Sequence, residues 1–190
     1  MMESALIVSC IEKNTAFFTD MLNAASVNQI TALNNAGGAR RLLLERDFDL
    51  VIIDSPLQDE SGERMSRHIA SKGLSQVILA VKGEYFDAVS AVCEDDGVLV
   101  ISKPVTKEIF WSVLSLAKSV KNRIKRIQAE NAQLKQKIDD IGIINRAKCL
   151  LISYLNMSEQ EAHRYIEKQA MDMRTAKRTI AEGILKMYAN

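Results

Sequence analysis

A heptad repeat in the middle of the chain constrains its fold most. From Phe110 onward, apolar residues recur at alternating spacings of three and four. No Gly or Pro lies between Val105 and Asp140 to end a helix. The repeat positions are Phe110, Val113, Ala117, Val120, Ile124, Ile127, Asn131, Leu134, Ile138, Ile141 and Asn145. The pattern predicts one helix from Thr106 to Asn156, with residues 106–141 forming a parallel two-stranded coiled coil.

Asn131 is a polar residue at an a position of this repeat. An amide at such a position can pair with its own copy across the axis, which fixes the register and favours two strands. Glu130 and Lys135 occupy g and e positions, where they would attract each other across a parallel dimer. The stripe also fits a single amphipathic helix that folds back on its own N-terminal domain, and this alternative stays open.

Residues 1–105 alternate short apolar runs with helical patterns. The predicted strands are Ala5–Val8, Gln29–Leu33, Leu50–Ile53, Val77–Val81 and Val98–Ile101, and the predicted helices are Asn14–Ala25, Ala36–Arg46, Ser61–Ser71 and Tyr85–Glu94. Strands that alternate with helices predict an α/β domain with a five-stranded parallel sheet covered on both faces. Chemistry in such sheets belongs at the carboxyl ends of the strands. The residues at those ends are Ser9, Cys10, Asp54, Ala80 and Lys103.

Two segments at these strand ends carry a resemblance. LVIIDSPLQDESG, with Asp54 ending the third strand, and VISKPV, with Lys103 after the fifth, resemble the receiver domain of two-component response regulators. The resemblance implies a flavodoxin-like domain over residues 1–117. It also implies that Asp54 is the phosphoacceptor equivalent, that Lys103 pairs with the phosphate, and that a cis peptide precedes Pro104. A carboxylate nucleophile needs nearby cations to approach an anionic phosphate, so the residue types fit this chemistry.

Two departures from the receiver pattern bear on phosphotransfer. Receivers hold Mg²⁺ with a pair of acids after the first strand, where this chain has Ser9 and Cys10, and Mg²⁺ prefers hard carboxylate oxygens. Ala80 stands where receivers have a Thr or Ser that contacts the phosphoryl group. We therefore predict a pseudo-receiver with no metal site, in which Asp54 is not phosphorylated and keeps an ion pair with Lys103. A protein or small-molecule partner would then control it, at the carboxyl edge of the sheet or on the last helix of the domain.

Residues 142–190 predict an all-α domain of three short helices. The first, Ile143–Leu155, continues the coil and ends at Asn156. The second begins with a capping box, because Glu161 follows Ser158 by three residues. The third runs from about Arg174 to Met187, with Met173 and Ile180 among its inward residues.

The segment INRAKCLLISYLNMSEQEAHRYIEKQAMDMRTAKRTIAEGIL resembles the ANTAR domain, an RNA-binding antitermination module that follows a receiver and a coiled coil. The matching residues are Ala147, Lys148, Ser158, Glu159, Glu161, Ala162, Ala170, Arg174, Ile180 and Ala181. Cys149 replaces a Gly found in many members. The resemblance implies a homodimer that binds a pair of stem-loops in leader RNA and prevents a terminator hairpin from forming.

Charge supports a nucleic-acid partner for the second half. Residues 1–110 hold 10 Lys and Arg against 16 Asp and Glu, and residues 111–190 hold 15 against 8. Five cations of the last domain are candidate RNA contacts, suited to phosphates and unpaired loop bases: Arg146, Lys148, Arg174, Lys177 and Arg178. Tyr165 and Tyr188 could stack on a base, but both fall on inward-facing periods and are expected in the core.

Other features exclude several classes of protein. No apolar run reaches the length of a membrane span, and the N-terminus lacks a basic region before its apolar segment, so we expect a cytoplasmic protein. Cys10, Cys93 and Cys149 have neither disulfide nor zinc spacing and are expected to be buried. We expect no cofactor and no enzymatic activity. A DNA-binding response regulator and a scaffold protein that binds no nucleic acid remain the alternatives.

Overall fold

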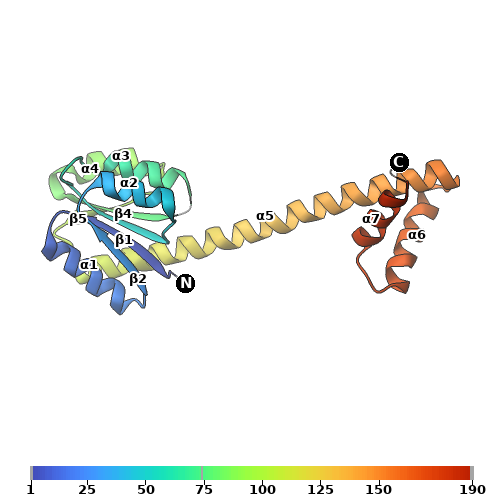
Figure 1. The fold of residues 1–190 in the computed structure, drawn as a ribbon. Helices are drawn as coiled ribbons and strands as arrows, with labels where there is room; N and C mark the ends of the chain where they lie inside the picture. Colours follow the sequence, from blue (N-terminus) through green and yellow to red (C-terminus); the bar gives the residue numbers. More distant parts are fainter. Residues whose placement is uncertain (1, 74, 189–190) are drawn as a thin grey trace. The chain divides into compact units, whose positions relative to one another are not determined.

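The computed structural model describes residues 2–73 and 75–188 (Figure 1). The chain divides into two compact units, Met1–Ile124 and Lys125–Asn190, so the boundary falls inside the long helix α5 (Lys107–Leu155). This helix was predicted within one residue at each end. None of the described helices is both long and apolar enough to span a membrane.

The first unit is a parallel sheet with the strand order β2-β1-β3-β4-β5. Its strands are β1 (Ser4–Ser9), β2 (Gln29–Leu33), β3 (Leu50–Asp54), β4 (Gln76–Lys82) and β5 (Leu99–Lys103), and its helices before α5 are α1 (Glu12–Ala24), α2 (Ala36–Glu45), α3 (Glu63–Ser71) and α4 (Phe86–Cys93), with a short 3-10 turn, η1 (Gly83–Tyr85). This confirms the predicted α/β class. The register places Asp54 between Ser9 and Ala80, so three residues distant in sequence meet at one edge.

Each face of the sheet has its own core. On one face, α1 and α5 pack Phe18, Leu22, Phe110 and Leu114 against the strands. On the other, α2, α3 and α4 contribute the side chains Ala39, Met65, Ile69 and Cys93 (Figure 1). Buried on both sides, the central strands are continuously apolar, as parallel strands usually are.

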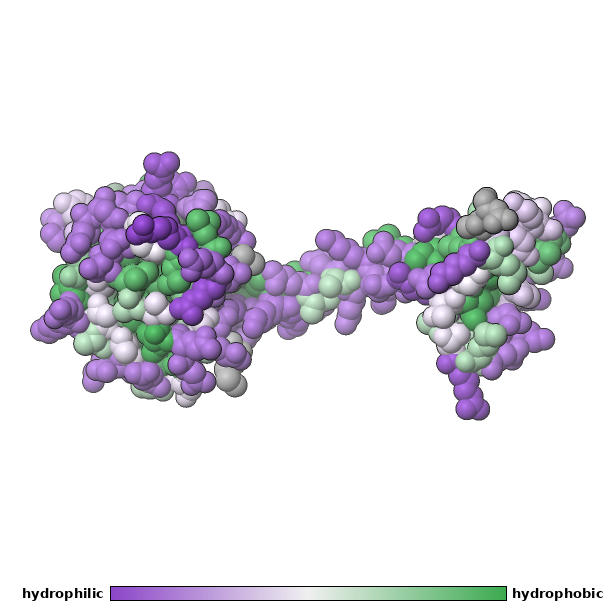
Figure 2. All heavy atoms as spheres, in the orientation of Figure 1, coloured by the Kyte–Doolittle hydropathy of each residue, from purple (hydrophilic) through white to green (hydrophobic). Residues whose placement is uncertain are grey.

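The first turns of α5 correct the predicted coiled coil. Phe110 and Ala117 are fully buried against the sheet, so they cannot also face a second helix. Further along, Ile127, Leu134, Ile138 and Asn131 are exposed in the described chain. Figure 2 shows the surface of the middle of α5 as mostly hydrophilic with a few apolar side chains. The predicted seam is therefore wrong for the first turns, because the sheet takes their inner face, and for the later positions the coiled coil stays a prediction.

An ion pair between Lys121 and Asp49 ties α5 to the amino ends of the strands. Lys121 is almost buried, and its ammonium group donates to Asp49 Oδ1. Asp49 Oδ2 accepts from the backbone amides of Glu3 (2.5 Å) and Ser4 (3.2 Å). Burial acts to raise the pKa of Asp49, but these amides and Lys121 outweigh it and hold the pKa below its ordinary value.

This low pKa predicts an acid-dependent loss of stability in the first unit. A carboxyl whose pKa is depressed by folding contributes stability above its unfolded-state pKa of about 3.9, and that contribution is lost as the pH falls through the folded-state pKa. Urea unfolding at several pH values, followed by the fluorescence of Trp111, should show the decline. In Asp49→Asn the curve should be flatter below about pH 5. Identical slopes in the two proteins would contradict the assignment.

The second unit contains the end of α5 with α6 (Glu159–Asp172) and α7 (Lys177–Tyr188). The three helices close a small core of Ala147, Leu151, Ala162, Ile166, Ala181 and Ile184. The capping box is confirmed: Ser158 Oγ accepts from the Glu161 amide, and Glu161 Oε2 accepts from the Ser158 amide. Asn156 ends α5 in the left-handed conformation (φ 51°), as its residue type indicated.

The predicted start of the third helix was three residues too early. Arg174 has φ 50°, and hydrogen bonds from its amide to Met171 and from the Thr175 amide to Ala170 close α6 in a Schellman arrangement. Arg174 therefore belongs to the turn. Met173 and Tyr165, both predicted to face inward, are 66% and 40% exposed.

Candidate nucleic-acid interface and the Asp54 site

Asp54 lies at the carboxyl edge of the sheet, where Oδ2 accepts two hydrogen bonds and the buried Oδ1 meets Lys103 as an ion pair without a hydrogen bond among the described residues. Asp54 is 1% exposed. Lys103 Nζ lies 2.5 Å from Oδ1, so the predicted ion pair is present. Oδ2 accepts hydrogen bonds from Ser9 Oγ (2.7 Å) and Asn14 Nδ2 (2.8 Å). The carboxylate is thus enclosed by its own domain. Ser9 and Asn14 bind to Oδ2 and block the approach of a phosphoryl donor to this oxygen.

The residues around Asp54 do not suit the Mg²⁺ that the receiver resemblance implies. Ser9 Oγ already donates to Asp54, and Cys10 Sγ donates to the Pro56 carbonyl oxygen at 3.3 Å. A neutral hydroxyl and a thiol do not supply the anionic carboxylate oxygens through which proteins usually hold Mg²⁺. No group of three or more His, Cys, Asp or Glu able to hold a metal occurs in the described chain. The cis peptide implied before Pro104 is present.

This geometry predicts that acetyl phosphate with Mg²⁺ will leave the protein unmodified. The donor would have to displace Ser9 and Asn14 from a buried carboxylate without a metal to neutralise the approaching charge. Intact-mass spectrometry measures this directly. A stable gain of one phosphoryl group that disappears in Asp54→Asn would contradict it. A variant with Ser9→Asp, Cys10→Asp and Ala80→Thr is the positive comparison, because it restores the missing groups.

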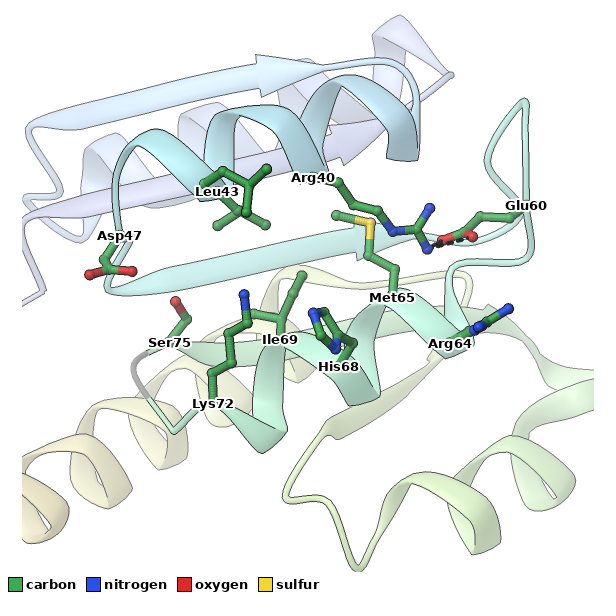
Figure 3. Close-up of a pocket in the computed structure, with 11 residues that line it drawn as sticks. Arg40, Leu43, Asp47, Glu60, Arg64, Met65, His68, Ile69, Lys72 and Ser75 are labelled. Atoms are coloured by element: carbon green, nitrogen blue, oxygen red, sulfur yellow. Dashed lines mark hydrogen bonds and ion pairs between the residues drawn. The ribbon is translucent and has the colours of Figure 1, made fainter.

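Two cavities of the first unit lie near the elements that surround Asp54. One of about 470 Å³ is lined by Ser55, Pro56, Tyr85 and Val89 and lies at the expected carboxyl edge. The other, of about 570 Å³, lies between α2 and α3 (Figure 3). Its apolar surface comes from Leu43, Met65 and Ile69, and an ion pair between Arg40 and Glu60 (2.7 Å) bridges its rim. Asp54 lines neither cavity.

Three of the five predicted RNA-binding cations form ion pairs that join the helices of the second unit. Lys148 Nζ lies 2.7 Å from Glu159 Oε1 and joins α5 to α6. Lys177 pairs with Glu167 and joins α7 to α6. Arg178 lies 2.7 Å from Asp140 Oδ1 and joins α7 to α5. Each ion pair thus connects a different pair of helices.

These ion pairs shift the ionisation of their acids in one direction. Hydrogen bonds from Lys148, Lys177 and Arg178 hold the pKa of Glu159, Glu167 and Asp140, respectively, below the ordinary values. Hydrogen bonds from Arg178 to Glu182 and Asp140 raise the pKa of its guanidinium. An RNA phosphate would compete with these carboxylates for the three cations.

The five cations do not form one cluster. Arg146 and Lys148 are two positions apart on α5, which places them on opposite faces of the helix. Arg146 and Arg174 are exposed, and the described residues give neither an ion-pair partner. They are the two cations of the set most accessible to phosphate.

The structure adds surface groups that the sequence patterns did not single out. Arg164 and Lys168 lie one turn apart on the exposed side of α6, a spacing readable from the sequence. Tyr154, 62% exposed, packs on Tyr188 with ring centroids 4.9 Å apart, and Tyr188 contacts the core as predicted. Cys149 is exposed and Cys10 half-buried, so only Cys93 of the three cysteines is buried as expected.

Comparisons with known proteins agree with this arrangement. Residues 132–185 match the family model of the ANTAR domain. The chain is 28% identical over 138 residues to the transcriptional regulatory protein PdtaR of Mycobacterium tuberculosis, covering 73% of this chain and 67% of the relative. It is 26% identical over 137 residues to the aliphatic amidase regulator of Pseudomonas aeruginosa, covering 71% and 69%.

Solved structures support the fold of the first unit. The signal receiver domain of an HD domain-containing protein from Pseudomonas fluorescens superposes with a TM-score of 0.58 at 20% identity, covering 66% of this chain and 93% of that one. NtrX from Brucella abortus gives a TM-score of 0.60 at 16% identity, covering 68% and 29%. The fold and the family match define a chain of two parts. The chain consists of an N-terminal receiver-fold domain and a C-terminal ANTAR domain linked by one long helix.

Proposed function

We propose that this chain is an RNA-binding transcription antitermination regulator that acts as a dimer on paired stem-loops in leader RNA. The ANTAR match over residues 132–185 carries the proposal. The names of the two relatives, both regulators, support it. In this view the protein acts by binding and not by catalysis.

The exposed apolar stripe on α5 supports the dimer. Ile127, Leu134, Ile138 and Ile141 are 43%, 55%, 68% and 58% exposed in the described chain. Apolar residues at this spacing bury one another when a second helix packs in parallel. Asn131, also exposed, would pair with its copy and fix the register.

The occupied Asp54 site supports control by a partner in place of phosphorylation. With Lys103, Ser9 and Asn14 bound to the carboxylate, the receiver-fold domain already neutralises the charge that a phosphoryl group would change. The partner would bind at the carboxyl edge or on the exposed surface of α5. Binding of the partner would then change either dimer formation or the access of RNA to the second unit.

RNA binding is tested with hairpin pairs selected from a library with randomised loops, against duplex DNA carrying the same number of phosphates. We expect the RNA to bind more tightly, and Arg146→Gln to reduce the salt slope of binding by about one unit, because each phosphate contact releases about one counterion. Arg174→Gly should do the same without harming the fold, because Gly favours the left-handed conformation of Arg174.

Lys186→Gln is the matched control for these variants, since Lys186 is an exposed cation of α7 outside the candidate set. Its salt slope should equal that of the wild type. Equal affinity for RNA and DNA, or no selected RNA at all, would refute the proposed function.

A further inference from the structure

The cavity between α2 and α3 is lined by two rows of side chains at helical spacing. Arg64, His68 and Lys72 follow one another at steps of four, so they share one side of α3 and its C-terminal end. Across the cavity, α2 and the turn after it contribute the second row: Arg40, Leu43, Leu44 and Asp47. Figure 3 shows the Lys72 side chain reaching from the end of α3 toward Leu43.

The floor of this cavity is apolar. Met65 and Ile69 are buried, Leu43 is half-buried, and Leu44 at the edge is 79% exposed. The volume of about 570 Å³ falls within the range of about 300–1,000 Å³ that is usual for small-molecule sites. The cavity can therefore hold the apolar body of a small ligand.

The rim of the cavity is positively charged, although residues 1–110 are acidic as a whole. Its lining includes three residues with a positive charge, Arg40, Arg64 and Lys72, against two with a negative charge, Asp47 and Glu60. Glu60 is already neutralised, because both of its carboxylate oxygens accept hydrogen bonds from Arg40 (2.8 and 2.7 Å). No ion pair of the described chain involves Arg64 or Lys72. These two cations can therefore pair with an anionic group from outside.

The loop after Asp54 fastens the two walls of the cavity together. Asp59 accepts hydrogen bonds from the backbone amides of Ala36 and Gly37, both at 2.9 Å, at the start of α2. The ion pair between Glu60 and Arg40 adds a second link between this loop and α2. A site whose walls are held before binding loses less freedom when a ligand arrives.

We propose that the cavity between α2 and α3 binds a small organic anion, a carboxylate that carries an aliphatic body. The aliphatic body would lie on Leu43, Met65 and Ile69, and the carboxylate would pair with Lys72. Arg64 would add to the positive potential at the other end of the row. Burial of the aliphatic surface supplies affinity, and the two cations select a negative charge over a neutral or a positive one.

Calorimetric titration of the full chain with octanoate, octan-1-ol and octylammonium tests this proposal, because the three probes differ mainly in charge. Octanoate should bind at least about fivefold more tightly than octan-1-ol, since one exposed ion pair at about 4 Å changes affinity by roughly that factor. Octylammonium should bind more weakly than octan-1-ol. These results depend neither on RNA binding nor on a dimer.

Variants locate the site. Lys72→Gln with Arg64→Gln should abolish the preference for octanoate and leave the affinity for octan-1-ol unchanged. Arg41→Gln with Lys13→Gln is the matched control, because both are exposed cations of the same domain that do not line the cavity. Glu60→Gln should act in the opposite direction and tighten octanoate binding at least about threefold, because it removes a negative charge and releases Arg40.

Two results would overturn the site. One is equal affinity for the three probes, or no saturable binding of octanoate at millimolar concentration. The other is a preference for octanoate that survives Lys72→Gln with Arg64→Gln, or that the control pair of changes reduces equally. Circular dichroism of each variant verifies that its helix content is that of the wild type, so that a lost preference reports on the cavity and not on the fold.

Discussion

Replacing Lys103 with Met should lower the unfolding free energy of the receiver-fold domain by about 3 to 5 kcal/mol, the usual loss when one partner of a buried ion pair is removed. Asp54, which is 1% exposed, would keep Ser9 and Asn14 but lose Lys103, the one cation that pairs with it among the described residues. Urea unfolding at pH 7, followed through Trp111 fluorescence, measures the change.

Two further variants distinguish a buried-charge effect from lost packing. Asp54→Asn combined with Lys103→Met should recover most of the stability, since it removes the uncompensated charge. Lys107→Met is the control, because Lys107 is exposed at the start of α5, and it should change the free energy by less than about 0.5 kcal/mol. A loss below about 1 kcal/mol in Lys103→Met would mean that the ion pair is not needed to compensate Asp54.

Changing Leu134 and Ile138 together to Asp should dissociate the dimer. Each side chain is more than half exposed in the described chain, so the fold of one chain does not depend on it. Burying each in a coiled coil contributes about 1.5 to 3 kcal/mol, so the double change should weaken association by at least about 1,000-fold. Analytical ultracentrifugation should find monomers at micromolar concentration.

The same variant should lose its preference for paired stem-loops. Two RNA sites on one dimer gain affinity from effective concentration, by a factor of about 100 to 10,000, and a monomer cannot have this gain. Binding to a single stem-loop should stay unchanged, because the second unit keeps its core. Ala132→Asp with Gln133→Asp adds the same charge outside the stripe and should remain dimeric. Retention of the paired-site preference by the monomer would refute the paired-hairpin mechanism.

The ion pairs at Asp54 and between the helices of the second unit have a structural role. Lys103, Lys121, Lys148 and Arg178 all hold elements in place. In the second unit, the proposed RNA binding would therefore draw on cations that also join the helices. Arg146 and Arg174 are free of that conflict and are the clearest positions at which to measure RNA contacts alone.

Local patterns in the sequence determined much of the architecture. Alternating apolar runs defined the five strands, the absence of Gly and Pro defined α5, and Ser158 with Glu161 defined the start of α6, because each depends on neighbours within a few residues. Asp54 and Lys103 could be paired from their positions at strand ends. Asn14 could not, because its approach to Asp54 depends on how α1 packs on the sheet.

Only the tertiary structure decided which side of α5 is inside. Phe110 and Ile109 are adjacent apolar residues, and heptad spacing chose Phe110 for the coil, whereas the sheet buries it and leaves Ile109 outside. The same holds for the cations of the second half, which composition showed to be basic. Their ion pairs depend on the packing of three helices, because each partner lies on another helix: Lys148 with Glu159, Lys177 with Glu167 and Arg178 with Asp140. Periodicity in the sequence indicates that a helix has an apolar face. Which of two adjacent apolar faces becomes buried depends on long-range contacts with the sheet, because the burial of apolar surface stabilises the fold.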